Sequence, residues 1–230
     1  MTTQRIAVIG LGQRIAHVLA AMKEMGWDLR VDGYVDPAPV GAPIMQAAGI
    51  SPGREFATPE ALLADGPYDL VMIGTPNHLH RTHLKAAFAA GYPIFSEKPI
   101  VRTEAETFDL ARAIAAPKAG HASPPLYIGL VMRSMPIVKE TIARVDAGEL
   151  GELISMDATE HLPPEHGAYL ARNWRRRSDW GGSFMLDKVC HDFDIFGRLA
   201  RARPAKVASF GGRRIFTPER ADGPRQYEDG

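Results

Sequence analysis

The feature that most constrains the fold is an alternation of short apolar runs with helical patterns in the first half of the chain. Residues 5–9 form a β-branched run that ends at Gly10-Leu11-Gly12, and residues 15–25 follow with apolar side chains on one helical stripe. The same alternation predicts further strands at 29–35, 70–73 and 93–96, and helices at 40–48, 59–64, 80–90 and 103–116. Strands and helices joined by short loops predict an α/β fold with a doubly wound parallel sheet.

The first strand, glycine turn and helix fit the pattern that binds a dinucleotide. Gly10 permits a tight turn, and Gly12 lets the backbone approach a pyrophosphate at a helix N-terminus. Ile15 stands where a third glycine is usual, so close packing of helix on strand must be achieved differently. Asp36 ends the second strand at about the spacing of a residue that binds the adenosine ribose. No arginine follows Asp36, which favours NAD over NADP without excluding NADP; alternatively, Asp36 only begins a turn.

Polar residues also follow the third and fourth strands. Thr75-Pro76-Asn77 comes after residues 70–73, and Glu97-Lys98-Pro99 comes after residues 93–96. Ligands of doubly wound sheets bind at the carboxyl ends of the strands. We therefore expect both segments to converge with the glycine turn on one crevice, although Asn77 could instead cap the helix at 80–90.

The second half predicts a smaller α+β unit. The Pro- and Gly-containing loop at 117–125 is the best domain boundary, which gives a dinucleotide-binding domain at 1–120 and a partial substrate or oligomerisation domain at 126–230. We expect strands at 126–130, 153–160 and 206–216, a helix at 137–147, and a mobile tail at 215–230. Three strands make a marginal sheet, so its apolar face would need a cover.

A second chemical signal lies in the stretch after Gly181-Gly182. The apolar residues between 186 and 199 recur at helical spacing, which places Asp187, His191 and Asp194 on one face. A carboxylate one turn from an imidazole can orient a general base near neutral pH. The alternative is a buried histidine in a salt bridge.

Composition narrows the function further. Formal net charge is zero over 230 residues, which gives no indication of a nucleic-acid or membrane partner. One cysteine, Cys190, and no signal-peptide pattern predict a soluble protein of the reducing cytoplasm. His161, His166 and the face at 187, 191 and 194 could form a metal site, but the sequence has no compact ligand cluster, so no metal is expected. The basic segment at 172–177 could contact nucleic acid, but a solvated surface is the simpler interpretation.

Taken together, these motifs resemble those of the Gfo/Idh/MocA oxidoreductases, and the resemblance covers essentially the whole chain. The motifs are Gly10-Leu11-Gly12, Asp36, Thr75-Pro76-Asn77, His80, Glu97-Lys98-Pro99 and the segment 187–194. The resemblance implies an NAD(P)-dependent dehydrogenase acting on a sugar or polyol, with a Rossmann domain and a mainly antiparallel second sheet that often forms the subunit interface. It implies a homo-oligomer through that sheet. Catalytic roles fall on Lys98, Asp187 and His191, and substrate contacts on those three and Arg133. The expected cofactor-binding residues are Gly10, Gly12, Gln13, Arg14, Ile15, Asp36, Thr75, Pro76, Asn77, His80, Glu97, Lys98, Trp174 and Arg175.

The chemistry that this implies needs a hydride acceptor, a proton acceptor and a group that holds the oxygen. The nicotinamide would supply the first. His191 would take the hydroxyl proton with Asp187 orienting its ring, and Lys98 would stabilise charge on the oxygen. Glu97 would steer the lysine or contact the nicotinamide ribose.

The chain departs from the family pattern in three places. Ile15 replaces a small residue, Ser134 follows Arg133 where an aromatic is common, and the second half has few strands. An alternative is therefore a catalytically incomplete dinucleotide-binding or oligomerising module, or a fragment of a longer dehydrogenase. The sequence leaves the choice between enzyme and module open.

Overall fold

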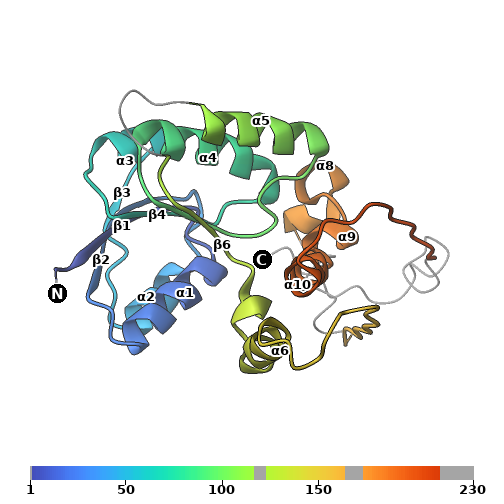
Figure 1. Ribbon diagram of the computed structural model, residues 1–230. Helices are drawn as coiled ribbons and strands as arrows, with labels where there is room; N and C mark the ends of the chain where they lie inside the picture. The colour runs from blue at the N-terminus through green and yellow to red at the C-terminus, as the bar shows by residue number, and fades with distance from the viewer. Residues whose placement is uncertain (1, 117–122, 164–172, 213–230) are drawn as a thin grey trace.

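The computed structural model describes residues 2–116, 123–163 and 173–212. Its centre is a six-stranded sheet in the order β3-β2-β1-β4-β5-β6, in which every neighbouring pair is parallel (Figure 1). The predicted doubly wound sheet is thus confirmed. The strands are β1 (Gln4–Ile9), β2 (Leu29–Val35), β3 (Arg54–Glu55), β4 (Leu70–Ile73), β5 (Ile94–Ser96) and β6 (Leu126–Ile128).

Helices cover both faces of this sheet (Figure 1). Alternate residues of β1 separate into two apolar clusters: Ile6 and Val8 pack with α1 and α2, whereas Ala7 and Ile9 pack with α3, α4 and α5. Burying an aliphatic side chain of this kind stabilises the folded state by about 1.5–3 kcal/mol. The helices are α1 (Gln13–Glu24), α2 (Ala42–Ala47), α3 (Pro59–Ala64), α4 (Asn77–Ala90) and α5 (Glu104–Ala115).

Local signals set several helix ends. The Thr103 hydroxyl accepts a hydrogen bond from the Glu106 N–H, which confirms the predicted N-cap of α5. Gly91 ends α4 in the left-handed conformation. This helix begins at Asn77, three residues before the predicted start, because Pro76 supplies an extended residue at its N-cap.

Packing beneath the glycine turn explains how Ile15 replaces a third glycine. Gly10 has φ +87°, and a Cβ there would lie 2.4 Å from the Thr75 nitrogen, so only glycine fits. Ile15 is fully buried, and a Cβ on Gly74 would lie 2.2 Å from its Cγ1 atom. The space that a glycine in α1 usually provides is therefore provided by Gly74 at the end of β4.

The second half differs from the prediction. A strand was predicted at 126–130, and β6 occupies Leu126–Ile128, but it pairs with β5 in the first sheet, not in a second, antiparallel one. The predictions of a strand at 153–160 and, over its described residues, at 206–216 were wrong. These segments are exposed and irregular, because nothing in the described part of the chain pairs with their backbone. The whole of the predicted tail at 215–230, like His166 and Arg172, lies outside the described residues.

The described second half otherwise consists of helices joined by turns and irregular segments. The helices are η1 (Val131–Ser134), α6 (Pro136–Asp146), η3 (Asn173–Arg176), α8 (Ser178–Gly181), α9 (Phe184–Asp187) and α10 (Cys190–Ala200). Two bidentate ion pairs connect these helices. Arg133 of η1 binds both carboxylate oxygens of Asp194 in α10, and Arg198 of α10 binds both carboxylate oxygens of Asp146 in α6. Within the described ranges, no helix combines the length and apolar character needed to span a bilayer.

Gly74→Ala tests the contact beneath the turn. The added methyl group collides with Ile15, so we expect a loss of about 1–3 kcal/mol in the free energy of unfolding, measured by urea denaturation. Ile15→Ala should cost less stability in the Gly74→Ala background than in the wild-type chain, because it removes atoms that the added methyl group meets. Gly211→Ala, where a Cβ meets nothing within 4 Å, is the matched control. Equal stabilities of Gly74→Ala and the control would show that the packing is not tight.

Candidate functional site

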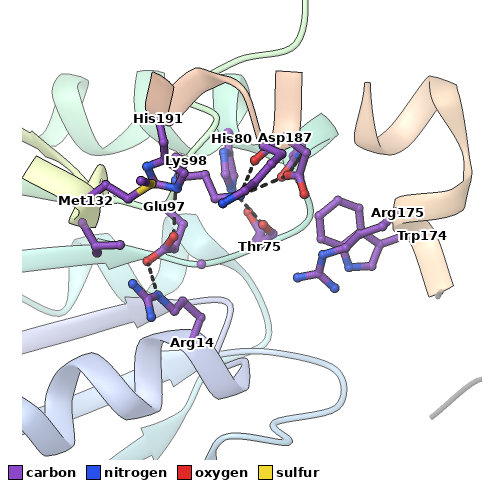
Figure 2. Close-up of a pocket in the computed structure, with 15 residues that line it drawn as sticks. Arg14, Thr75, His80, Glu97, Lys98, Met132, Trp174, Arg175, Asp187 and His191 are labelled. Carbon is purple, nitrogen blue, oxygen red and sulfur yellow. Dashed lines mark hydrogen bonds and ion pairs between the residues drawn. The ribbon is translucent and has the colours of Figure 1, made fainter. Parts of the chain in front are cut away.

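A cavity of about 430 Å³ lies where the carboxyl ends of β4 and β5 meet the helices of the second half (Figure 2). Its position agrees with the crevice expected beside β1, since β2 and β3 lie on one side of that strand and β4 to β6 on the other. The residues that line it are Arg14, Gly74, Thr75, Asn77, His80, Glu97, Lys98, Gly129, Val131, Met132, Trp174, Arg175, Asp187, Lys188 and His191.

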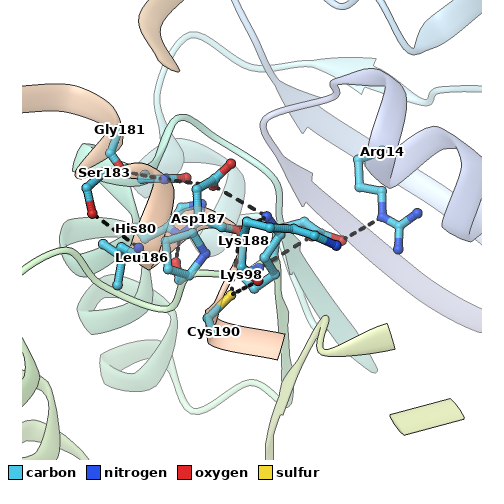
Figure 3. Close-up of polar contacts among 12 residues, drawn as sticks. Arg14, His80, Lys98, Gly181, Ser183, Leu186, Asp187, Lys188 and Cys190 are labelled. Carbon is cyan, nitrogen blue, oxygen red and sulfur yellow. Dashed lines mark hydrogen bonds and ion pairs between the residues drawn. The ribbon is translucent and has the colours of Figure 1, made fainter. Parts of the chain in front are cut away.

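Lys98 joins the two halves of the site. It comes two residues after the end of β5, and its ammonium donates to the Asp187 carbonyl oxygen at 2.6 Å and lies 3.4 Å from carboxylate atom Oδ1 (Figure 3). Both side chains are largely buried, with exposed fractions of 18% and 7%. Because a buried charge is costly without a partner, this pair ties the strand-end lysine to the late helices.

The late helix is broken, contrary to prediction. α9 ends at Asp187 and α10 begins at Cys190, so Asp187 and His191 do not share one continuous helix. Within the described chain, Asp187 Oδ2 and His191 Nδ1 are both buried without a hydrogen-bond partner. Asp194 does lie one turn from His191 on α10, as predicted, but its carboxylate binds Arg133. Asp187 and His191 nevertheless line one cavity, and their unpartnered atoms are available to a ligand.

His191 is suited to accept a proton. It is buried, and burial lowers its pKa, with the charges of Lys98 and Lys188 lowering it further. Asp194 and Glu160 act in the opposite direction but less strongly. The neutral imidazole, the form that a general base requires, is therefore favoured at neutral pH.

Glu97 and Arg14 form the wall of the cavity next to the glycine turn. Arg14 Nε lies 3.3 Å from Glu97 Oε1, and the carboxyl group is largely buried while the guanidinium is half exposed. Burial raises the pKa of Glu97, and the nearby Arg14 charge opposes that rise only in part. Gly129 lies against the same carboxyl group, since a Cβ there would approach Oε1 to 3.0 Å.

His80 connects the two loops that carry the site. Its Nδ1 lies 2.7 Å from the Pro99 carbonyl oxygen, and its Nε2 lies 2.8 Å from that of Thr75. The ring is fully buried, and burial lowers its pKa. Thr75 also contacts His83, whose pKa burial lowers to about 4. These contacts fix the loop after β4 relative to Lys98.

The opposite wall comes from the second half. Trp174 and Arg175 both line the cavity, with the guanidinium 4.4 Å from the indole ring centre. Lys188 lines it as well and forms an ion pair with Glu160 at 2.7 Å. Figure 2 shows Trp174 and Arg175 across the cavity from Glu97.

Some predicted site residues lie outside the cavity lining. Gln13 is exposed, Asp36 accepts a hydrogen bond from the Ala38 N–H as a turn would, and Arg133 is engaged by Asp194. Gly10, Gly12, Ile15 and Pro76 shape the backbone around the turn and the start of α4.

Sequence reasoning missed five lining residues. Only one of them left a usable signal: Gly74 sits at a strand carboxyl end, directly before Thr75. The others are Gly129, Val131, Met132 and Lys188, which reach the cavity through the path of the chain after β6 and the break between α9 and α10. In the described ranges, no group of three or more His, Cys, Asp or Glu residues is arranged to hold a metal.

Two family models match this chain. Residues 4–120 match the oxidoreductase family model with an NAD-binding Rossmann fold, and residues 138–229 match the GFO/IDH/MocA C-terminal domain. The chain belongs to the Gfo/Idh/MocA oxidoreductase family. This confirms the resemblance, and NAD, the cofactor predicted from the sequence, is the one that the family model names.

Curated relatives in the Gfo/Idh/MocA family include inositol 2-dehydrogenases. The one from Leifsonia xyli is 27% identical over 222 residues, covering 96% of this chain and 60% of the relative. The one from Rhizobium meliloti is 28% identical over 208 residues, covering 90% and 58%. The chain thus spans little more than half the length of these relatives.

Solved structures of the family share the fold. The scyllo-inositol dehydrogenase of Lactobacillus casei, with bound NAD(H) and scyllo-inositol, has a TM-score of 0.67 at 22% identity, with 87% of this chain and 57% of that one covered. The WlbA dehydrogenase of Bordetella pertussis, in complex with NADH and UDP-GlcNAcA, has a TM-score of 0.69 at 22% identity, with 86% and 58% covered.

The raised pKa of Glu97 predicts how stability changes with pH. Its ordinary value is 4.5, and the folded value is higher, so between the two the folded chain binds more protons than the unfolded chain. Stability therefore falls as pH rises through this interval. Glu97→Gln removes the titration, so urea denaturation across pH 4–8 should show wild type losing stability relative to Glu97→Gln as pH increases. The opposite slope would mean that the Arg14 ion pair outweighs burial.

Proposed function

We propose that the chain transfers a hydride between a sugar or polyol hydroxyl and NAD. The observation that carries the proposal is the convergence of Lys98, Asp187 and His191 on one cavity beside the glycine turn. Family membership supports the oxidoreductase class, and the inositol dehydrogenases among its relatives support a polyhydroxylated substrate.

The residues around the turn fit a dinucleotide. Gly12 is the N-cap of α1 without a side-chain capping bond, and a Cβ there would meet only the Gly74 carbonyl oxygen, at 3.9 Å. The free N–H groups of α1 and this open space suit a pyrophosphate. Arg14 adds a half-exposed positive charge. Asp36 would bind the adenosine ribose, for which its turn hydrogen bond to Ala38 leaves acceptor capacity.

Three side chains would act on the substrate. Bound NAD supplies the hydride acceptor. His191, neutral through burial, would take the hydroxyl proton. Lys98 would donate to the reacting oxygen and stabilise its developing negative charge. Asp187 holds Lys98 and presents its unpartnered Oδ2 atom, which can accept a hydrogen bond from a neighbouring hydroxyl.

Gly12→Val tests the cofactor site without disturbing the fold. The Cβ atom meets only the Gly74 carbonyl oxygen, at 3.9 Å, so we expect the free energy of unfolding to change by about 1 kcal/mol or less. NADH affinity, followed by cofactor fluorescence, should fall by at least about 10-fold because the side chain occupies the approach to the α1 N-terminus. Unchanged NADH affinity would place the dinucleotide elsewhere.

Turnover of two variants tests the catalytic assignment. The measurement is NADH formation with a panel of inositols, aldoses and a nucleotide-linked sugar acid. Lys98→Ala should lower kcat about 100- to 1000-fold through the lost donor, and His191→Ala about 100-fold or more through the lost base. The exposed Lys23 at the end of α1 offers a control, since Lys23→Ala should keep wild-type turnover. Near-native turnover in either site variant contradicts its role.

A dinucleotide-binding module is the second candidate. The segment at 151–163 favours this candidate, because it is irregular and leaves apolar side chains exposed where the prediction placed a strand of the second sheet. Ile154, for example, is 83% exposed. NADH binding without turnover on any member of the panel would support this candidate over the dehydrogenase.

A further inference from the structure

We propose that Asn77 is a positioning residue that fixes Asp187 and the turn before it, and that its side chain does not serve as a cofactor contact. The inference rests on the function proposed above. Asn77 is buried, with 3% exposure, and is the first residue of α4. The N-cap of that helix is Pro76, and no side chain caps it, so Asn77 does not have the capping role that its position in the sequence allowed.

The side chain of Asn77 instead reaches across to the second half of the chain. Its Nδ2 donates to the Gly181 carbonyl oxygen at 2.8 Å and lies 3.5 Å from Asp187 Oδ1. Both neighbours are acceptors, so the amide nitrogen and not the amide oxygen must face them. Its two hydrogens match two acceptors that are 104 and 110 residues away in the sequence.

The contact with Asp187 decides which carboxylate oxygen is available. Lys98 Nζ lies 3.4 Å from the same Oδ1 atom that faces Asn77. Oδ2 is buried and has no partner in the described chain. Two donors on Oδ1 hold the carboxylate in one orientation and leave Oδ2 for a ligand. Without Asn77, only the lysine would restrain that orientation.

The contact with Gly181 fixes the turn that leads into α9. Gly181 is buried, and a Cβ there would lie 2.9 Å from the Arg175 carbonyl oxygen, while Gly182 has φ +97°. Neither glycine has a side chain to anchor the turn. Nearby, Arg102 binds the Asp179 carbonyl oxygen and the rings of His78 and Trp180 lie 4.3 Å apart. Asn77 is thus one of four side chains from the cofactor domain, with His78, Lys98 and Arg102, that hold residues 179–187.

A double-mutant cycle tests this role. Asn77→Asp keeps the size of the side chain but presents oxygen to two acceptors, and Asn77→Ala removes the amide. We expect kcat to fall about 10- to 100-fold in either variant, while the dissociation constant for NADH, measured by fluorescence, stays within about 2-fold. In an Asp187→Ala background, Asn77→Ala should lower kcat no further, because its effect passes through Asp187. Thr103→Ala, which removes the N-cap of α5, controls for lost stability and should keep kcat.

Two results would overturn the inference. One is a rise of about 10-fold or more in the dissociation constant for NADH with kcat unchanged, which would make Asn77 a cofactor contact. The other is a loss of kcat in the double variant equal to the product of the two single losses.

If the chain turned over no substrate, the proposed function would be contradicted and kcat could not report on Asn77. The contact between Asn77 and Asp187 is then tested by NMR. The side-chain amide resonances of Asn77 in a ¹⁵N–¹H spectrum can be assigned by their loss in Asn77→Asp. Asp187→Ala should then shift at least one of them, whereas Glu97→Gln should not. Resonances that ignore Asp187→Ala would overturn the inference.

Discussion

The contact between Lys98 and Asp187 is the interaction on which the site depends. It joins a lysine at the end of a buried strand to an aspartate that follows it by 89 residues. Both groups are largely buried, so each charge needs the other. Because Lys98 also donates to the Asp187 backbone carbonyl, the contact fixes the end of α9 as well as its carboxylate. The position of His191, at the start of α10, follows from that.

Contacts within the cofactor domain fix the position of Lys98. Lys98 lies just past the end of β5, and His80 connects the next residue, Pro99, to Thr75 in the loop after β4. Arg14 connects the glycine turn to Glu97, the residue next to Lys98. The glycine turn, the two strand-end loops and the lysine are therefore one connected unit. A ligand at the turn lies within reach of the groups that would act on the substrate.

Much of the first half could be predicted from sequence because its signals are local. The runs at β1, β2, β4 and β5 are apolar and bounded by glycine or polar residues, and the Thr103 cap marks its helix directly. The compensation between Ile15 and Gly74 could not be predicted, since it depends on two residues 59 positions apart whose contact only the packed helix and strand create. Sequence showed that the third glycine was missing but not what replaced it.

The second half was harder because strand pairing is not local. β6 has three residues, and nothing in them shows that they join β5 and not a later strand. The segment 186–199 has helical periodicity throughout, yet the helix is interrupted between α9 and α10. The sequence predicted that Lys98, Asp187 and His191 would lie together, and all three line one cavity. It also predicted that Asp187 would orient His191, whereas the Asp187 carboxylate contacts Lys98. The roles of the three residues in catalysis remain predictions.

A crystal structure of the chain with NADH tests the central claim most directly. The account predicts the pyrophosphate at the N-terminus of α1 and the nicotinamide ring in the cavity, within contact distance of Lys98 and with His191 facing the same space. A nicotinamide bound outside that cavity, or Lys98 and Asp187 separated in the complex, would contradict it.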